Sequence, residues 1–166
     1  MRTIELETYN ERWPDEFQRE VVLLEAVFGD NLIRAHHVGS TAIKDCCAKP
    51  VIDIVLEVAS LYEIDRQSIQ LEALGYEAKG AFGIAGRCFF QKGGDRRTHH
   101  LHAFELGNPD IDRHRLFVEY MNARPDKMAE YALLKTELAK KYRDSPEKYS
   151  AGKAAFIDMI ENSAMK

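Results

Sequence analysis

Hydrophobic residues recur along the chain in two spacings, one typical of helices and one typical of strands. Residues 15–29 carry apolar side chains three or four positions apart, which predicts an amphipathic helix ending at Gly29. A second helix is predicted over 61–75, with Ser60 as its cap and Gly75 at its end. Shorter apolar runs between turn residues predict five strands, at 33–38, 51–58, 76–79, 87–92 and 98–105.

The last third of the chain has a helical pattern only. Three helices are predicted, over 111–124, 126–143 and 145–164; Pro125 precedes the second, and Ser145-Pro146 opens the third. Strands followed by a run of helices indicate an α+β fold, in which a small mixed sheet is flanked by helices and followed by a helical C-terminal extension. We expect one domain over 1–166, with an α/β part over about 1–108 and a helical part over about 110–164.

Composition excludes several classes of protein. A hydrophobic content of 45% argues against disorder, and a formal net charge of −4 gives no overall attraction for DNA. The three cysteines form no disulfide framework, and the charged N-terminal segment does not resemble a signal peptide. Because no apolar run is long enough to cross a membrane, we expect a cytoplasmic protein without a membrane partner.

A carboxylate-bearing strand follows a glycine-serine turn. In the strand at 51–58, alternate residues face the core, while Asp53, Val55 and Glu57 share the other face. The turn Gly39-Ser40-Thr41 offers hydroxyls, N–H groups and close backbone approach, which suit a phosphate. The pair predicts phosphates held beside Mg²⁺ on Asp53. The alternative is a solvated carboxylate at the sheet surface.

Two further groups of residues suggest anion or metal binding. In THHLHAFE, His100 and His102 point the same way on a strand and can converge on a metal or a phosphate. The alternative is a pair of half-exposed surface histidines. Residues 85–102 carry four cations against one acid, and of these Arg87 and Lys92 flank a strand and suit phosphate contacts. A solvated basic rim is the alternative.

Two Tyr-Lys pairs have helical spacing. Tyr131 and Lys135 lie four residues apart on one predicted helix, as do Tyr149 and Lys153 on the next. We interpret both pairs as side chains that cover the helix surface, although each could reach a ligand.

Several motifs together resemble a known family. HVGSTAIKDCCAKPVIDIVLEV at 37–58 resembles the central motif of the GrpB-like family, a branch of the nucleotidyltransferase-like superfamily. The resemblance extends over nearly the whole chain, through YNERWPDEF, LEALGYE, GRCFFQK, THHLHAFE, LFVEYMNARP and EYALLKTELA. It implies a polymerase-β-like nucleotidyltransferase fold, in which Gly39 and Ser40 contact phosphates and Asp53 is a metal ligand. GrpB-like domains also occur fused to dephospho-coenzyme A kinase.

The chain departs from the superfamily pattern at three positions. Val55 stands where the superfamily has a second acid, and Glu57 is too far along the strand to share a small cation with Asp53. Val118 and Glu119 stand where the family usually has Arg and Asp. The missing second acid, with histidines in place of an acid on the later strand, puts a two-metal transfer in doubt, and the changes at Val118 and Glu119 are expected to remove a ligand contact.

The leading hypothesis is a nucleotidyltransferase-like protein that binds a nucleoside triphosphate with Mg²⁺ and transfers a nucleotidyl group to an unknown acceptor. Its expected residues are catalytic Asp53 and Glu57, the metal ligands Asp53, His100 and His102, and the phosphate-binding Gly39, Ser40, Thr41, Lys49, Arg87 and Lys92. The alternatives are a non-catalytic module for a nucleotide or phosphorylated small molecule, and a hydrolase with another divalent metal at the histidine pair. The sequence leaves the oligomeric state open.

Overall fold

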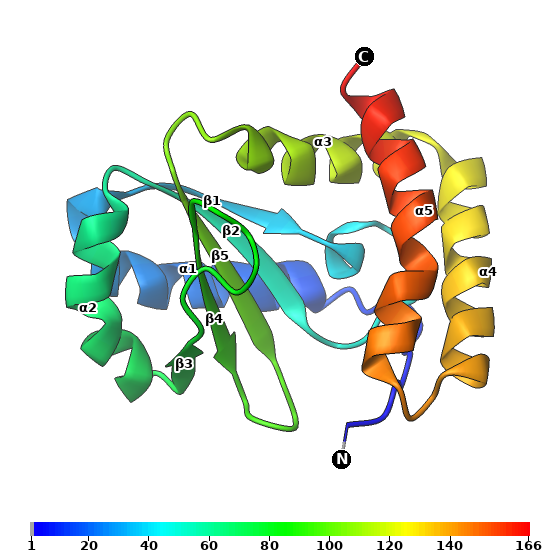
Figure 1. The fold of residues 1–166 in the computed structure, drawn as a ribbon, viewed down its shortest axis with the longest axis horizontal. Helices are drawn as coiled ribbons and strands as arrows, with labels where there is room; N and C mark the ends of the chain where they lie inside the picture. Colours follow the sequence, from blue (N-terminus) through cyan, green and yellow to red (C-terminus); the bar gives the residue numbers. More distant parts are fainter. Residues whose placement is uncertain (1) are drawn as a thin grey trace.

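The structure of the chain is a computed structural model that describes residues 2–166 (Figure 1). Its elements in chain order are α1 (Trp13–Phe28), β1 (Leu32–Val38), β2 (Ile52–Val58), α2 (Leu61–Ala73), β3 (Tyr76–Ala78), β4 (Arg87–Lys92), β5 (His99–Glu105), α3 (Pro109–Ala123), α4 (Pro125–Lys141) and α5 (Pro146–Ala164). Two 3₁₀ turns, η1 (Gly29–Asn31) and η2 (Ser40–Ala42), flank β1. Every predicted helix and strand is present, with ends within two residues of the prediction.

The five strands form one mixed sheet in the order β1-β2-β5-β4-β3. Only β2 and β5 pair in parallel, and the other neighbours are antiparallel. The chain leaves β2, forms α2 and the β3–β4 hairpin, and returns as β5 next to β2. This arrangement confirms the predicted α+β fold, and it puts the two central strands side by side although they are far apart in sequence.

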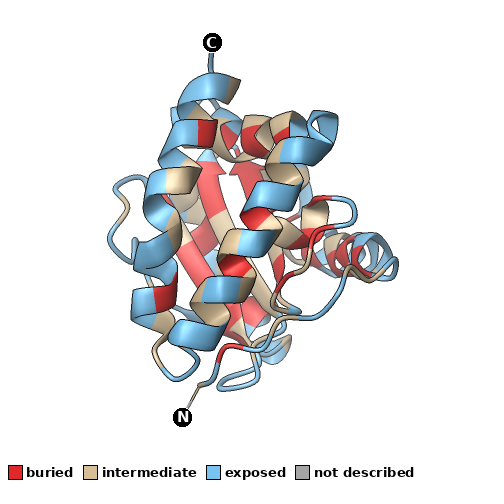
Figure 2. Ribbon diagram, turned by 90° about the vertical axis from the view of Figure 1, so that its right-hand side faces the viewer, coloured by how far each residue is buried: buried red, intermediate tan, exposed pale blue. Residues whose placement is uncertain are grey.

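The sheet separates a large core from a smaller one. Helices α1 and α2 cover one face, where Ile52, Ile54, Leu56 and Val58 of β2 are buried as predicted. Figure 2 shows buried residues concentrated on the sheet behind the helices. Helix α3 crosses the other face over β1 and β2, and Val55 is buried beneath it. Burial of these aliphatic side chains stabilises the fold by about 1.5 to 3 kcal/mol each.

Helices α3, α4 and α5 pack together beside the sheet, near the turn that follows β1 (Figure 1). A small core joins them to that turn, and it consists of Ile43, Cys46, Phe117, Met121, Tyr131 and Ile160. Helices α4 and α5 therefore stand across a gap from the carboxylate-bearing face of β2. No helix within residues 2–166 combines the length and apolar character needed to span a membrane.

Candidate functional site

Asp53 lies where the central strands β2 and β5 run side by side. In the register of this pair, Asp53 is opposite His100, and His102 follows on the same face of β5. His100 Nδ1 lies 3.3 Å and His102 Nε2 lies 3.2 Å from the same oxygen, Asp53 Oδ1. The parallel pairing thus builds an Asp-His-His cluster from residues that are nearly fifty positions apart.

The histidines keep Asp53 ionised. Burial alone would raise the pKa of Asp53, but hydrogen bonds from His100 and His102 outweigh it and hold the pKa well below 3.8. Both imidazoles bind Oδ1, and no residue in the described chain donates to Oδ2. Asp53 therefore presents one carboxylate oxygen that is free to meet a ligand.

Arg87 sets the tautomer of His102. Its Nη1 is 3.3 Å from His102 Nδ1, and because arginine can only donate, Nδ1 accepts and Nε2 carries the proton bonded to Asp53. The remaining guanidinium nitrogens donate to the carbonyl oxygens of Ala81 (3.1 Å) and Phe82 (2.8 Å). Arg87 was expected to contact phosphate, but its buried guanidinium instead ties the β3–β4 loop to the cluster.

Gly39 packs directly against Asp53. Its φ is +72°, and a Cβ at this position would lie 2.6 Å from Asp53 Oδ2. Only glycine satisfies both the backbone conformation and the close approach. The turn at Gly39 and Ser40 is therefore adjacent to the carboxylate, as expected. Thr41 lines the same cavity as Asp53, but it is buried and its hydroxyl bonds to His37 Nε2 at 2.9 Å.

Three lysines approach the cluster from opposite sides. Lys49 precedes β2, and Lys135 and Lys153 come from α4 and α5. The ammonium groups of Lys49 and Lys153 lie 5.4 and 4.7 Å from the centre of the Tyr149 ring, and within the described residues neither has a carboxylate within 4 Å or a hydrogen-bond acceptor. Lys135, which is 1% exposed, donates to the carbonyl oxygen of Cys47.

Burial lowers the pKa values of all three lysines. The pKa of Lys153 falls to about 8, because burial and then the neighbouring Lys49 and Lys135 disfavour its charge. Burial, reinforced by other cations, likewise lowers the pKa of Lys49, and burial lowers that of Lys135. Nearby cations that lack an anionic partner form a site that favours a bound anion.

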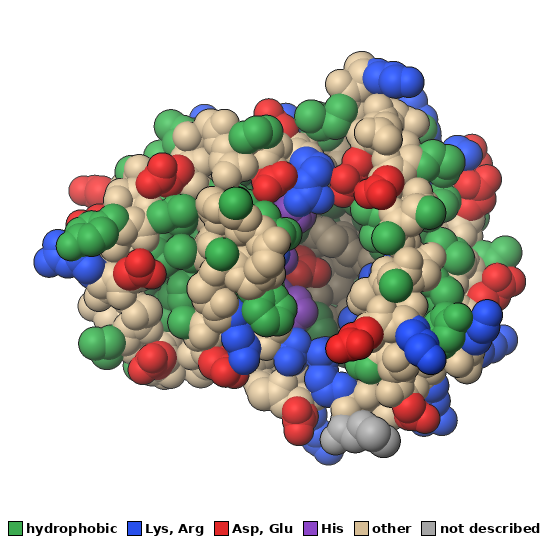
Figure 3. Space-filling model, in the orientation of Figure 1, with side chains coloured by type: hydrophobic (Ala, Val, Ile, Leu, Met, Phe, Trp, Pro, Cys, Tyr) green, Lys and Arg blue, Asp and Glu red, His purple; other side chains and the backbone are tan. Residues whose placement is uncertain are grey.

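Two adjoining cavities connect these groups. One, of about 200 Å³, is lined by Ser40, Lys49, Asp53, His100, Lys135 and Lys153, among others. The other, of about 260 Å³, shares Ser40, Asp53 and Lys153 and extends towards α3. We call the two cavities together the lysine cleft. Figure 3 shows this hollow, with acidic and histidine side chains on its floor and basic side chains at one end.

An aromatic side chain stands next to the cluster on the β3–β4 loop. Phe82 is 59% exposed and stacks on Phe89, with ring centres 5.2 Å apart and planes inclined by 14°. The Phe89 ring in turn contacts the rings of His100 and His102, at 5.4 and 5.1 Å. Phe82 adopts φ +48°, a conformation that is strained for a bulky residue and that tends to occur at functional sites. One face of Phe82 is therefore covered and the other is available.

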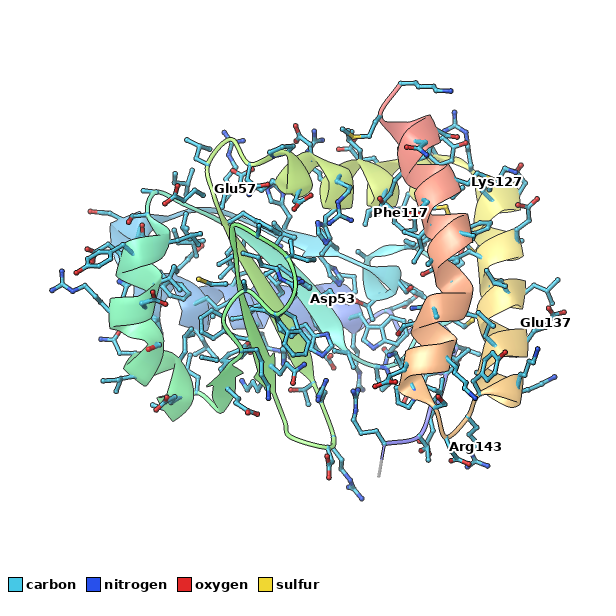
Figure 4. All side chains as sticks on the ribbon, viewed as in Figure 1. Asp53, Glu57, Phe117, Lys127, Glu137 and Arg143 are labelled. Carbon is cyan, nitrogen blue, oxygen red and sulfur yellow. The ribbon has the colours of Figure 1, made fainter. Side chains whose placement is uncertain are left out.

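Two predicted site residues lie elsewhere. Glu57 is four residues along β2 from Asp53, roughly 13 Å, and pairs with His36 Nε2 at 3.3 Å (Figure 4). Lys92 points to the opposite face of the sheet, where its ammonium is 3.0 Å from the buried carboxylate of Glu20. The alternation of side chains along β4 sends Lys92 away from Arg87, so the structure does not bring Lys92 to the lysine cleft.

The residues present do not fit a resident Mg²⁺ site. In the part of the chain that the structure describes, no group of three His, Cys, Asp or Glu residues is arranged to hold a metal ion. Asp53 is the one carboxylate shared by both cavities of the lysine cleft, and its Oδ1 is taken by two imidazoles. Magnesium prefers several oxygen ligands, and the nearby ammonium groups repel a cation. Mg²⁺, or another divalent ion at the histidines, stays a prediction.

The interpretation of the Tyr-Lys pairs as surface residues is wrong. Tyr131, Lys135 and Tyr149 are at most 3% exposed, and Lys153 lines both cavities of the cleft. The missed signal was the repetition of a Tyr-Lys pair at the same helical spacing on two consecutive helices. Only the packing of α4 against α5, across from η2, turns both pairs inward.

Comparison with known proteins identifies the family. The model of the GrpB protein family matches residues 3–163. The chain belongs to the GrpB family. The glutamate-rich protein GrpB of Alkalihalophilus pseudofirmus is 36% identical over 95% of this GrpB-family chain and 93% of its own length. The UPF0157 protein YqkA of Bacillus subtilis is 46% identical over 99% of this chain, which spans 48% of YqkA.

A solved GrpB structure has the same fold. The crystal structure of the conserved protein GrpB from Enterococcus faecalis superposes with a TM-score of 0.94 and 34% identity, covering 97% of each chain. A more distant similarity, 27% identity over 91% of this GrpB-family chain, is to 44% of the dephospho-CoA kinase of Mycobacterium bovis. The α+β fold is thus that of the GrpB family and is compatible with the expected nucleotidyltransferase-like arrangement.

Proposed function

We propose that the chain binds a nucleoside triphosphate, with its phosphates in the lysine cleft and its base against Phe82. One observation carries the proposal: Lys49 and Lys153 approach the same tyrosine ring without an acceptor or an anionic partner among the described residues. A polyphosphate supplies the missing negative charge, and ammonium groups in a partly buried cavity bind it more strongly than they would in water.

The placement of the remaining groups supports a polyphosphate. Ser40 lines both cavities and offers a hydroxyl next to the lysines. Asp53 lies on the floor of the cleft, opposite the lysines. The cleft therefore has a cationic side and an anionic side. The phosphates belong on the side of α4 and α5, and a group that donates a hydrogen bond belongs at Asp53 Oδ2.

The exposed ring of Phe82 supports a nucleoside rather than a bare polyphosphate. Every base has an aromatic face, and stacking on an aromatic side chain contributes about 1 to 3 kcal/mol per base. Phe89 supports the ring from below, and Arg87 fixes the carbonyl oxygens of the loop that carries it.

Nucleotidyl transfer is the second candidate, and the free oxygen of Asp53 favours it. In such a reaction an acceptor hydroxyl attacks the α-phosphorus, the bond to the β-phosphate oxygen breaks, and pyrophosphate leaves. Because its pKa is low, Asp53 would orient the acceptor hydroxyl by accepting its hydrogen bond rather than store its proton, and that proton would leave with the pyrophosphate or pass to solvent. The lysines would neutralise the charge that develops on the pyrophosphate.

Isothermal titration of the chain with ATP, CTP, GTP and UTP, with and without Mg²⁺, tests the binding proposal. We expect binding of at least one nucleotide and an affinity at least tenfold lower for Lys153→Met, because the variant loses a charge-assisted contact. Lys148→Met is the matched control, since Lys148 is exposed on the same helix. Absence of binding for all four nucleotides would overturn the proposal.

An assay of nucleotide turnover distinguishes nucleotidyl transfer from nucleotide binding without catalysis. The chain is incubated with α-labelled nucleotide and a pool of small-molecule acceptors, and released pyrophosphate and labelled product are measured. Transfer predicts both products for the native chain and neither for Asp53→Asn, while the variant still binds nucleotide. Binding without labelled product would assign the chain to the non-catalytic class.

A further inference from the structure

Another cavity lies next to the lysine cleft and has a different chemistry. It has a volume of about 640 Å³ and lies between the N-terminal segment, the start of β2 and the β4–β5 turn. Its charged lining consists of Arg2, Lys49, Arg96 and Arg97, against Glu5 and Asp95. We call it the arginine cavity. It accounts for the part of the basic run at 85–102 that remains once Arg87 and Lys92 are engaged inside the protein.

The cations of the arginine cavity outnumber its two acids and form no close ion pair among the described residues. None of the four forms an ion pair within 4 Å in the described part of the chain. The ion pairs found there involve other lysines and arginines. Arg2, Arg97 and Lys49 are also close enough to repel one another, although Asp95 opposes the effect at Arg2. Burial and then the charge of Arg97 lower the pKa of Arg2, and Arg2 and Arg97 also contribute to the lowered pKa of Lys49.

The backbone holds these cations in place. Gly93 adopts φ +103°, and a side chain there would collide with the carbonyl group of Arg96, so the tight turn requires glycine. Arg97 Nε donates to the Gly94 carbonyl oxygen at 3.3 Å, which leaves both terminal nitrogens of its guanidinium for a ligand. A guanidinium fixed in this way suits bidentate contact with a phosphate.

Lys49 connects the two sites. It lines both the arginine cavity and the lysine cleft, as does Val51, and its ammonium group lies over Tyr149 at the cleft side. In Figure 3 basic side chains continue from the hollow towards the edge of this face. A molecule in the arginine cavity can therefore extend to Asp53 without crossing the protein interior.

We propose that the arginine cavity is a second anion subsite, which holds the phosphate group of a phosphorylated small molecule whose other end reaches the lysine cleft. This assigns a phosphomonoester or diphosphate as the chemical class of the second ligand. Its pairing with a nucleotide rests on the function proposed above, but the subsite itself is tested independently. A ligand that spans both cavities gains from binding at two linked points.

Calorimetric titration with inorganic pyrophosphate tests the subsite. The native chain is expected to bind two equivalents, one in each cavity. The double variant Arg2→Gln/Arg97→Gln is expected to bind one, with affinity for the arginine cavity reduced at least tenfold, and Lys153→Met is expected to lose the other equivalent. Since Arg97 also bonds to the turn, Arg2→Gln/Arg96→Gln repeats the test without that bond. Arg66→Gln, exposed on α2, is the control.

The outcomes separate the two proposals. A single equivalent that disappears in Lys153→Met and persists in both arginine double variants overturns the second subsite and leaves the proposed function standing. A single equivalent lost only in the arginine variants supports the subsite and counts against the lysine cleft. No binding of pyrophosphate by the native chain overturns the second subsite, and the nucleotide titration described above then decides the lysine cleft.

Discussion

Replacing Lys153 by methionine should stabilise the protein while it weakens nucleotide binding. The pKa of Lys153 lies at about 8 instead of 10.5, chiefly because burial disfavours the charged amine. At about 1.4 kcal/mol per pH unit, this difference corresponds to about 3 kcal/mol of unfavourable free energy at pH 7. Methionine keeps most of the side-chain volume and removes the charge, so we expect stabilisation of up to about 3 kcal/mol.

The effect of the Lys153→Met substitution should depend on pH in one direction. Below pH 8 both the folded and the unfolded native chain hold the proton, and the full penalty is present. Between pH 8 and 10.5 the unfolded chain holds a proton that the folded chain has released, so the free energy of unfolding of the native chain rises with pH. The advantage of the variant should therefore shrink over this range and vanish above it.

Urea unfolding of both chains at pH 7 and pH 10, followed by the fluorescence of Trp13, measures the two differences. Lys148→Met, an exposed change on the same helix, should alter stability by less than about 0.5 kcal/mol at either pH. If Lys153→Met is destabilising, or if its effect is the same at both pH values, the argument from burial is refuted. Titration with nucleotide on the same samples should show that the more stable variant binds at least tenfold more weakly.

Three other substitutions test separate parts of the structure. Gly39→Ala should destabilise the chain by more than the backbone strain of about 1 to 2 kcal/mol and should reduce nucleotide affinity, because its Cβ would also displace Asp53. Gly107→Ala, with φ +90° and open space around it, should bring the backbone strain alone and leave affinity unchanged; thermal unfolding and titration compare the two. Phe82→Ala should weaken ATP binding about tenfold and leave the affinity for inorganic tripolyphosphate unchanged, and an equal loss for both ligands would contradict base stacking. Glu20→Gln should destabilise the chain by about 1 to 3 kcal/mol without changing nucleotide affinity, because this buried carboxylate bonds to a tyrosine and a lysine on the far face of the sheet. The lowered pKa of Glu20 means that its contribution to stability is lost as pH falls. An acid titration of stability should therefore show a smaller loss in the variant than in the native chain.

The elements of the fold could be predicted because their signals are local. The alternation Ile52, Asp53, Ile54 identifies both the strand and its buried face, and glycines mark the ends of helices and the turns of the hairpin. The mixed α+β class follows from the order of these elements. The parallel pairing of β2 with β5 could not be derived in the same way, because nothing in the local pattern states which strands become neighbours.

The candidate site was predictable on the strands and not on the helices. Gly39, Ser40, Asp53 and the histidines lie on adjacent elements whose alternation and resemblance to a family were visible in the sequence. The lysines of α4 and α5 were assigned to the surface, because helical spacing does not say which side of a helix meets another element. Lys92 was misplaced for a related reason: its charge suggested phosphate, while an acid on α1 was already its partner.

The alternation along β2 has a consequence for folding. Residues facing α1 are aliphatic, residues facing α3 include two acids, and the strand is fixed between an antiparallel and a parallel neighbour. Slippage of β2 by one position would turn both acids into the larger core and remove four aliphatic side chains from it, a penalty of several kcal/mol. The groups that equip this strand for chemistry therefore also reject incorrect pairings while the sheet assembles.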